Sequence, residues 1–171
     1  FSLQILNSQV KEKPILKPYK IGFLYNYGNE ENFIFNDPDY SYKTNTIKFQ
    51  GFYKLKTWNT FSLDLIVQPQ IQFIKHQLIN EQFVTPDQDN YLEKREEFTT
   101  LKNMNLYGLE FTFMFSKILS KSLSLQTGIS LGFSYIDTRT ERLAKGFTFI
   151  ENFSIGFSKK IFKHSYLYLG S

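Results

Sequence analysis

Few residues in the chain could carry acid–base, nucleophilic or metal chemistry. The 171 residues include two His and no Cys, so a catalytic thiol, a thiolate metal site and disulfides are excluded together. His76 could act as a general base, but a base needs a nucleophile within hydrogen-bond reach, and the pattern identifies none. His164 and Ser165 are neighbours in the sequence, and neighbours on a strand face opposite sides of the sheet. They therefore do not predict a nucleophile–base pair.

The acidic segments are better explained as solvated loops than as metal sites. Asp87-Gln88-Asp89 with Glu93 loosely resembles a calcium loop, yet the glycine and the full ligand spacing of an EF-hand are missing. Asn36-Asp37-Pro38-Asp39 consists of residues that favour turns. The charge run from Glu93 to Glu97 predicts the soluble lip of a loop, with an interaction surface as the alternative. No catalytic, cofactor-binding or metal-binding residue is assigned, and no cofactor is expected.

Composition limits the fold that must position such residues. The length suggests one domain, with a formal net charge of +4, a pI of about 9.1, 18% aromatic residues and a mean hydropathy of −0.32. No stretch approaches the roughly 18 unbroken apolar residues of a membrane helix, which excludes a helical membrane protein. A transmembrane barrel fits, because lipid-facing residues alternate with polar lumen-facing ones. Lys and Arg are scattered instead of forming a patch, which argues against a nucleic-acid partner.

Apolar and polar residues alternate along most of the chain, which places successive side chains on opposite faces of a strand. In SLSLQTGISLGFSY, Leu125, Ile129 and Phe133 share a large apolar face, whereas the other face is small and polar. This split is typical of a strand between lipid and a narrow lumen. Similar faces predict strands over residues 19–27, 47–55, 61–73, 109–115, 123–135 and 147–157, and a seventh strand that begins near His164. Pro69 and Glu151 break the pattern, so we expect a bulge or a rim position at each.

The connections alternate in length, as in outer-membrane barrels with short periplasmic turns and long external loops. Long connections are expected near 28–42, 77–102 and 137–146, and short ones near 56–60, 117–121 and 159–163. The chain would then start in the periplasm, with odd-numbered strands running outward. A bilayer tolerates no open sheet edge, and single-chain bacterial barrels have even strand numbers from eight upward. We therefore expect an all-β, antiparallel up-and-down transmembrane barrel of eight strands, of which about six and a half are present in this fragment.

The N-terminal residues predict processing. FSLQILNSQ followed by VKEK is similar to the end of a secretory signal's apolar core running into a cleavage region, with an ordered N-terminal strand as the alternative. We expect a leader remnant through about Gln9. The chain then divides into residues 1–17, a signal remnant and lead-in, and residues 18–171, an incomplete outer-membrane barrel domain.

Three segments carry a resemblance to a known family: IGFLYNYGNEENFIFNDPDYSY, QLINEQFVTPDQDNYLEKREEFT, and DTRTERLAKGFTF leading into FSIGFS. Through them, most of residues 18–171 resembles the PagL-type lipid A 3-O-deacylases, in the acyloxyacyl hydrolase-like branch found in Bacteroidetes. The resemblance implies an eight-stranded outer-membrane barrel that hydrolyses an ester of lipid A with a Ser-His-acid arrangement at the outer leaflet. The family's His-x-Ser-Asn motif lies on the penultimate strand. This sequence has no such motif, and His164-Ser165 lacks the spacer, so we expect the motif just past Ser171.

Two functions follow from these expectations. The first is an outer-membrane ester hydrolase that, at full length, deacylates lipid A, with Ser attacking the acyl ester after His accepts its proton. The alternative is a non-catalytic barrel that serves as a structural or docking subunit, and a transport channel is a weaker third option because side chains fill so small a barrel. Some basic residues near the external loops could meet lipid A phosphates, although rim solvation explains each equally well: Lys75, Lys94, Arg95, Lys102, Arg139, Arg142 and Lys145. The expected location is the bacterial outer membrane, and no oligomeric state is predicted.

Overall fold

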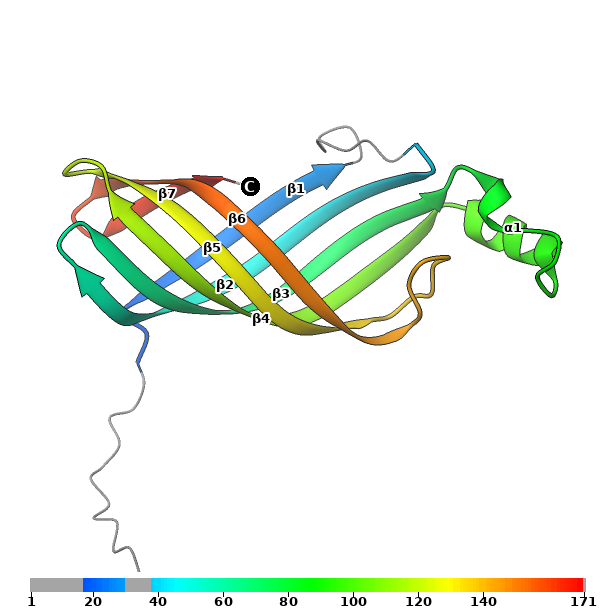
Figure 1. Ribbon diagram of the computed structural model, residues 1–171, viewed down its shortest axis with the longest axis horizontal. Helices are drawn as coiled ribbons and strands as arrows, with labels where there is room; N and C mark the ends of the chain where they lie inside the picture. Colours follow the sequence, from blue (N-terminus) through cyan, green and yellow to red (C-terminus); the bar gives the residue numbers. More distant parts are fainter. Residues whose placement is uncertain (1–16, 30–37, 171) are drawn as a thin grey trace, which may run out of the picture.

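The computed structural model describes residues 17–29 and 38–170, and they form one antiparallel sheet of seven strands (Figure 1). Apart from Lys17, the expected signal remnant lies outside these described residues, as do Asn36 and Asp37. The strands follow each other in sequence order across the sheet. They are β1 (Lys20–Asn29), β2 (Tyr40–Trp58), β3 (Phe61–Leu78), β4 (Lys102–Ile118), β5 (Leu123–Ile136), β6 (Gly146–Phe162) and β7 (Ser165–Gly170). This confirms an all-β meander.

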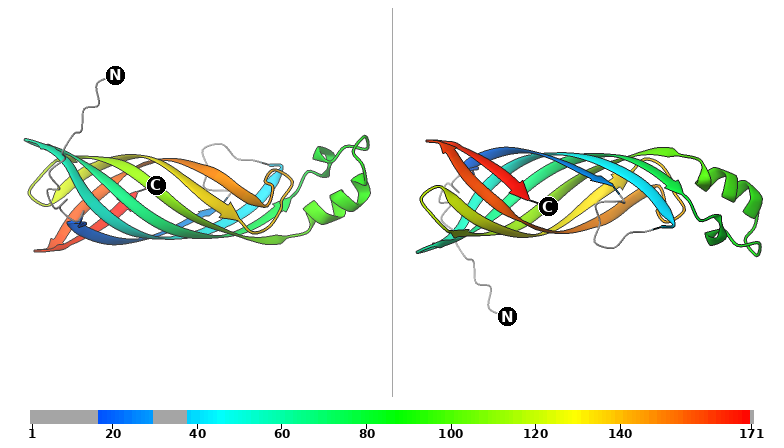
Figure 2. Two further views of the ribbon diagram at one scale, coloured as in Figure 1. Left: turned by 90° about the horizontal axis from the view of Figure 1, so that it is seen from below. Right: turned by 90° about the horizontal axis from the view of Figure 1, so that it is seen from above.

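The sheet curls about its long axis into a half-barrel, which Figures 1 and 2 show from the side, from below and from above. β1 and β7 are its two edge strands. They approach each other at one end, where the Lys20 ammonium lies 4.8 Å from the centre of the Tyr166 ring. β7 pairs with β6 only from Gly156 to Phe162. Within the described residues, the part of β6 from Gly146 to Ile155 has a strand partner on the β5 side alone.

The two faces of the sheet divide as the alternation predicts. On β5, Ile129, Leu131 and Phe133 point outward and are about half exposed, at 54%, 56% and 49%. Ser130 and Ser134 point inward and are buried. The same division runs through β1, where Ile21, Phe23 and Tyr25 are exposed, and through β6, where Phe147, Phe149 and Phe153 are exposed. A continuous apolar outer wall thus surrounds a largely polar interior.

The interior is packed in layers along the axis of the half-barrel. Phe52, Ile66 and Met114 form one apolar layer, and Met104, Leu106 and Ile136 form a second. Polar residues fill the space between the two layers. Small inward residues let the backbones approach there: at Gly132, a Cβ would come within 2.6 Å of the Leu109 carbonyl oxygen.

The described connections alternate in length as expected, whereas residues 30–37 of the long connection expected near 28–42 lie outside the described residues. The described long loops span residues 79–101 and 137–145, and the short turns lie between β2 and β3, between β4 and β5, and between β6 and β7. Figure 1 shows the three turns at the left-hand end and the long loops at the right. The loop before β4 contains a short 3-10 helix, η2 (Glu81–Phe83), and the helix α1 (Tyr91–Thr99). Neither helix was predicted, because the charged segment gave no apolar periodicity. Of the helices in the described part of the chain, none combines the length and the apolar character that crossing a bilayer requires.

Of the bulge or rim position expected at Pro69, the bulge is wrong, and Pro69 lies in the middle of β3. Pro69 pairs in regular register with Leu109 on β4. On the β2 side the pairing pauses between Lys48↔Gln70 and Gly51↔Val67 and then resumes in the same register. Pro lacks an N–H donor, so backbone hydrogen bonds between β2 and β3 are missing there although neither strand contains an extra residue. The irregularities lie instead beside the turns, between Lys54 and Lys56 and between Lys160 and Phe162.

The bulge expected at Glu151 is also wrong, and the alternative of a rim position stays a prediction. Glu151 pairs in register with Leu131 and stands on the exposed outer face of β6 between Phe149 and Phe153. An outward side chain needs no backbone adjustment to reach the surface, so the strand continues through it unchanged. Glu151 is therefore a carboxylate set within the apolar wall.

Candidate functional site

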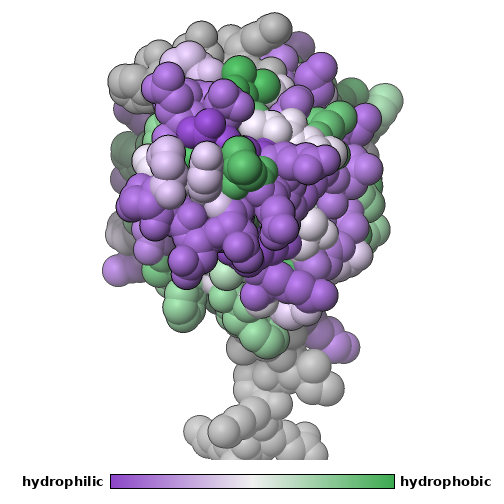
Figure 3. Space-filling view, turned by 90° about the vertical axis from the view of Figure 1, so that its right-hand side faces the viewer, coloured by the Kyte–Doolittle hydropathy of each residue, from purple (hydrophilic) through white to green (hydrophobic). Residues whose placement is uncertain are grey.

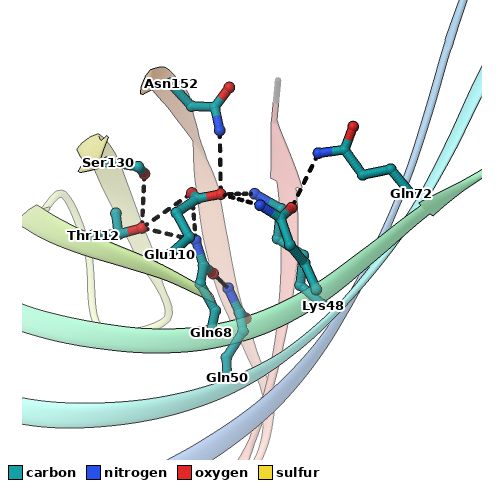
Figure 4. A network of polar contacts seen from close by, with 9 residues as sticks. Lys48, Gln50, Gln68, Gln72, Glu110, Thr112, Ser130 and Asn152 are labelled. Carbon is teal, nitrogen blue, oxygen red and sulfur yellow. Dashed lines mark hydrogen bonds and ion pairs between the residues drawn. The ribbon is translucent and has the colours of Figure 1, made fainter. Parts of the chain in front are cut away.

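The most highly organised polar group in the described residues surrounds the carboxylate of Glu110, in the middle of the half-barrel (Figure 4). Glu110 is on β4 and only 1% exposed. Its Oε2 accepts from the Lys48 ammonium at 2.8 Å, from the Gln70 amide at 3.0 Å and from the Asn152 amide at 3.1 Å. Its Oε1 accepts from the Gln68 amide at 2.7 Å. These donors compensate the desolvation of a buried ion pair, which is otherwise costly.

A second ring of hydrogen bonds extends this group, which we call the Glu110 network. The Gln68 amide also donates to Thr112 Oγ1 at 2.7 Å, and Thr112 shares a 2.7 Å hydrogen bond with Ser130. Gln50 donates to Gln68 at 2.8 Å, and Gln72 donates to Gln70 at 3.2 Å. The members come from β2, β3, β4, β5 and β6. The network therefore joins five successive strands from inside.

The Glu110 network has the character of a structural core more than of an active centre. Each carboxylate oxygen of Glu110 already accepts from strong donors, and neither His76 nor His164 belongs to the network. A cavity of about 560 Å³ adjoins it and is lined by residues of all seven strands. Because its lining includes charged and amide side chains, this cavity suits ordered water.

Two serines on the inner face of β5 provide a test of this interior. Ser130 shares the hydrogen bond with Thr112, whereas the buried Ser134 Oγ has no hydrogen-bond partner among the described residues. Ser130→Ala is therefore expected to lower the free energy of unfolding by about 1 kcal/mol. Ser134→Ala should leave it unchanged or raise it, because the variant removes an unpaired buried hydroxyl. Denaturant titration of the two variants measures the difference, and a greater loss for Ser134→Ala would contradict the interior packing described.

We call the end of the half-barrel that carries the long loops the loop end. There, the loops pack on a small apolar cluster of Tyr40, Leu78, Val84 and Phe98. The Tyr40 hydroxyl donates to Glu141, and the Arg142 guanidinium lies 3.7 Å from the centre of the Tyr40 ring. These contacts join the loop of residues 137–145 to the start of β2. Figure 3 shows this end of the molecule, whose surface is largely hydrophilic.

His76 lies beside Tyr40, one member of this cluster, and is partly exposed. Its ring lies 5.4 Å from the Tyr40 ring, centre to centre. That contact is with an aromatic face, so the structure supplies no support for His76 as a general base. His164 lies in the turn before β7, and Ser165 begins that strand.

The acidic segments lie in the loops, as expected. Hydrogen bonding to Thr85 holds the pKa of the exposed Asp87 below its ordinary value. The backbone N–H of Asn105, followed by its side-chain amide, does the same for the pKa of Asp137. Among the residues that the structure describes, no three His, Cys, Asp or Glu side chains gather as metal ligands would.

Some of the basic residues proposed to meet phosphates already have partners within the loops. Lys102 pairs with Glu97 at 2.7 Å, and Arg95 lies 3.9 Å from Glu81 and donates to the Val84 carbonyl at 2.9 Å. Arg139 packs over the Phe98 ring. The structure does not bring these cations into one anion-binding pocket.

The sequence alone does not predict the Glu110 network. Its only signal was a charge at an inward position of an alternating strand, as at Lys48 between Ile47 and Phe49 and at Glu110 between Leu109 and Phe111. The alternation assigns both to the inner face, but it does not show that residues 62 positions apart in the sequence meet.

Comparison of the chain with protein-family models, with curated proteins and with solved structures yields no match.

Proposed function

We propose that this chain forms the wall of a bacterial outer-membrane β-barrel that closes with eight strands, and that the full-length protein deacylates lipid A. One observation carries the membrane placement: large apolar side chains cover the outside of the curled sheet, while the buried polar residues lie inside it. In a water-soluble barrel the arrangement is the reverse, because the apolar side chains fill the core.

The open edges of the sheet support the closure. The outer edge of β1 and the part of β6 from Gly146 to Ile155 present backbone N–H and C=O groups without a strand partner among the described residues. In hydrocarbon each such group costs several kcal/mol. One further strand, together with an extension of β7, would satisfy both edges and give the smallest even-numbered barrel.

The enzymatic part of the proposal depends on the resemblance to the PagL-type deacylases. The full-length protein is expected to remove one acyl chain from lipid A, whereas residues 1–171 alone, which contain no His-x-Ser-Asn motif, should leave lipid A unchanged. Mass spectrometry of lipid A from cells that express each form makes the comparison. An active 171-residue form would contradict the proposal, as would a well-folded but inactive full-length protein that carries the motif.

A specific observation favours the alternative of a structural or docking subunit. In the described residues, the polar groups around Glu110 form a hydrogen-bonded network that includes neither His76 nor His164. Absence of the His-x-Ser-Asn motif from the full-length protein would decide for this alternative.

The proposed orientation places the long loops outside the cell and the short turns in the periplasm. Protease added to intact cells that express the full-length protein should therefore cut near Lys94 or Arg95 on α1 and should spare Lys159 and Lys160 beside the β6–β7 turn. Disrupting the outer membrane should expose the turn and serves as the control. Cleavage at Lys159 in sealed cells, with α1 protected, would show that the topology is inverted. The long loops would then face the periplasm, on the wrong side of the membrane for lipid A.

A further inference from the structure

The short-turn end of the half-barrel carries a concentration of positive charge. We define the turn end as residues 56–61, 117–123 and 159–165, which connect β2 to β3, β4 to β5 and β6 to β7. These segments contain no Asp or Glu and six exposed lysines: Lys56, Lys117, Lys121, Lys159, Lys160 and Lys163. None of the six forms an ion pair among those found in the described residues.

The loop end has the opposite balance. Its described loops, residues 79–101 and 137–145, contain eight acidic and five basic residues. Two of the acidic residues, Glu81 and Glu97, pair with cations of the same end. The net positive charge of the chain therefore comes in large part from the turn end.

The lysines at the turn end stand beside outward-facing aromatic rings. The Lys56 ammonium lies 5.1 Å from the centre of the Trp58 ring, and the Lys117 ammonium lies 5.5 Å from the centre of the Phe61 ring. Trp58 and Phe61 pair across the β2–β3 turn, and both rings are exposed. Aromatic rings at the end of an apolar barrel wall occupy the level of lipid headgroups, so the ammonium groups lie where headgroup phosphates would be.

We infer that the turn end is a docking surface for anionic phospholipid headgroups. Its lysines would raise the share of anionic lipid among the lipids that contact this end of the barrel. The inference rests on the proposed membrane placement and adds to it a preference among lipids. Lysine ammonium groups are hydrated point charges without the planar fork that selects one ligand geometry. They attract a layer of anionic headgroups over a Debye length.

The distribution of the lysines fits a lipid layer better than a compact ligand. They are divided among three turns, and none of the six lines the cavity next to the Glu110 network. A free phosphate compound would need several cations converging on one point, with shielding from water. A headgroup layer needs only a ring of cations at a common depth.

Trp58 is the only tryptophan of the chain, so its fluorescence reports on this surface alone. The protein is reconstituted in vesicles of phosphatidylcholine and phosphatidylglycerol at equal mole fractions, with brominated acyl chains on one lipid or on the other. Bromine quenches tryptophan on contact. Brominated phosphatidylglycerol is expected to quench Trp58 about twofold more than brominated phosphatidylcholine, because lysines near the surface enrich the anionic lipid.

Two triple variants that remove the same number of charges distinguish an effect of the turn-end lysines from an effect of the total charge of the protein. Lys56→Gln, Lys117→Gln and Lys121→Gln together remove half of the turn-end lysines, among them the two beside Trp58 and Phe61, and should clearly reduce the excess quenching by brominated phosphatidylglycerol. Lys75→Gln, Lys94→Gln and Lys145→Gln together remove the same charge from the loop end and should preserve the preference. Continued quenching of the turn-end variant by brominated phosphatidylcholine shows that it remains inserted.

Parity of the two lipids in the unaltered protein would overturn the inference and leave the barrel proposal intact. A preference that is undiminished in the turn-end variant would also overturn it, because the lysines would not be the cause. Absence of quenching by either lipid would place Trp58 outside the bilayer and overturn both the inference and the membrane placement.

Discussion

Replacing Lys48 by Met is expected to lower the free energy of unfolding by about 3 kcal/mol, because it leaves the carboxylate of Glu110 buried without its counter-ion. Glu110 is 1% exposed, and the ammonium of Lys48 is its only charged partner in the described network. The amides of Gln68, Gln70 and Asn152 would remain as donors, but amides do not neutralise the charge. Denaturant titration of the protein in detergent or vesicles measures the loss.

The matched control removes both charges. Combining Lys48→Met with Glu110→Gln leaves no charge in the Glu110 network, and the new amide can still pair with Gln68. The double variant should therefore recover most of the stability that the single variant loses. Equal losses in the single and double variants would contradict the account, because the charge of Glu110 would then not be the source of the cost.

Placing a charge in the middle of the outer wall is the second change with a large expected effect. Ile129 lies outward on β5, between Phe113 on β4 and Phe153 on β6. Ile129→Lys is expected to lower the free energy of unfolding in a bilayer by about 2–4 kcal/mol, since the ammonium must enter hydrocarbon. On a wall exposed to water, a surface substitution changes stability by about 0.5 kcal/mol or less.

Position along the strand supplies the control for that substitution. Tyr135 shares the outer face of β5 with Ile129 but stands near its loop end, so Tyr135→Lys should cost only about 0–1 kcal/mol. Glu151→Leu should have the opposite sign, because it removes a carboxylate from between Phe149 and Phe153. Equal effects of lysine at Ile129 and at Tyr135 would contradict a wall that spans a bilayer.

The strands were predictable because their signal is local. Each residue of SLSLQTGISLGFSY faces the side that the alternation assigns, and the register of β5 with β4 then follows from the short turn between these two strands. The same local rule failed at Pro69 and at Glu151. At Pro69, the antiparallel ladder lacks hydrogen bonds because proline has no N–H, yet no extra residue is inserted. At Glu151, the carboxylate points outward, so the backbone continues unchanged.

The contacts of the interior were not predictable, because they join distant parts of the chain. Lys48 and Glu110 meet across β3, and Tyr40 meets Glu141 from a loop 101 residues away. Helix α1 was missed for a related reason: it buries only Phe98 and has no apolar stripe for the sequence to reveal. The Glu110 network is therefore visible only in the structure, whereas the strands that position its residues are predictable from the sequence.

The outer face of this sheet is proposed to contact lipid. Spin labels placed singly along β5 from Leu123 to Ile136, in the protein reconstituted in vesicles, test this placement through collision with oxygen, which partitions into lipid, and with a nickel chelate, which stays in water. Labels at Leu125, Ile129 and Phe133 are predicted to favour oxygen, most strongly at Ile129, and labels at Gln126, Ser130 and Ser134 should not. Outward labels that collide with the nickel chelate as readily as a label on α1 would show that the wall faces water, and the barrel proposal would be wrong.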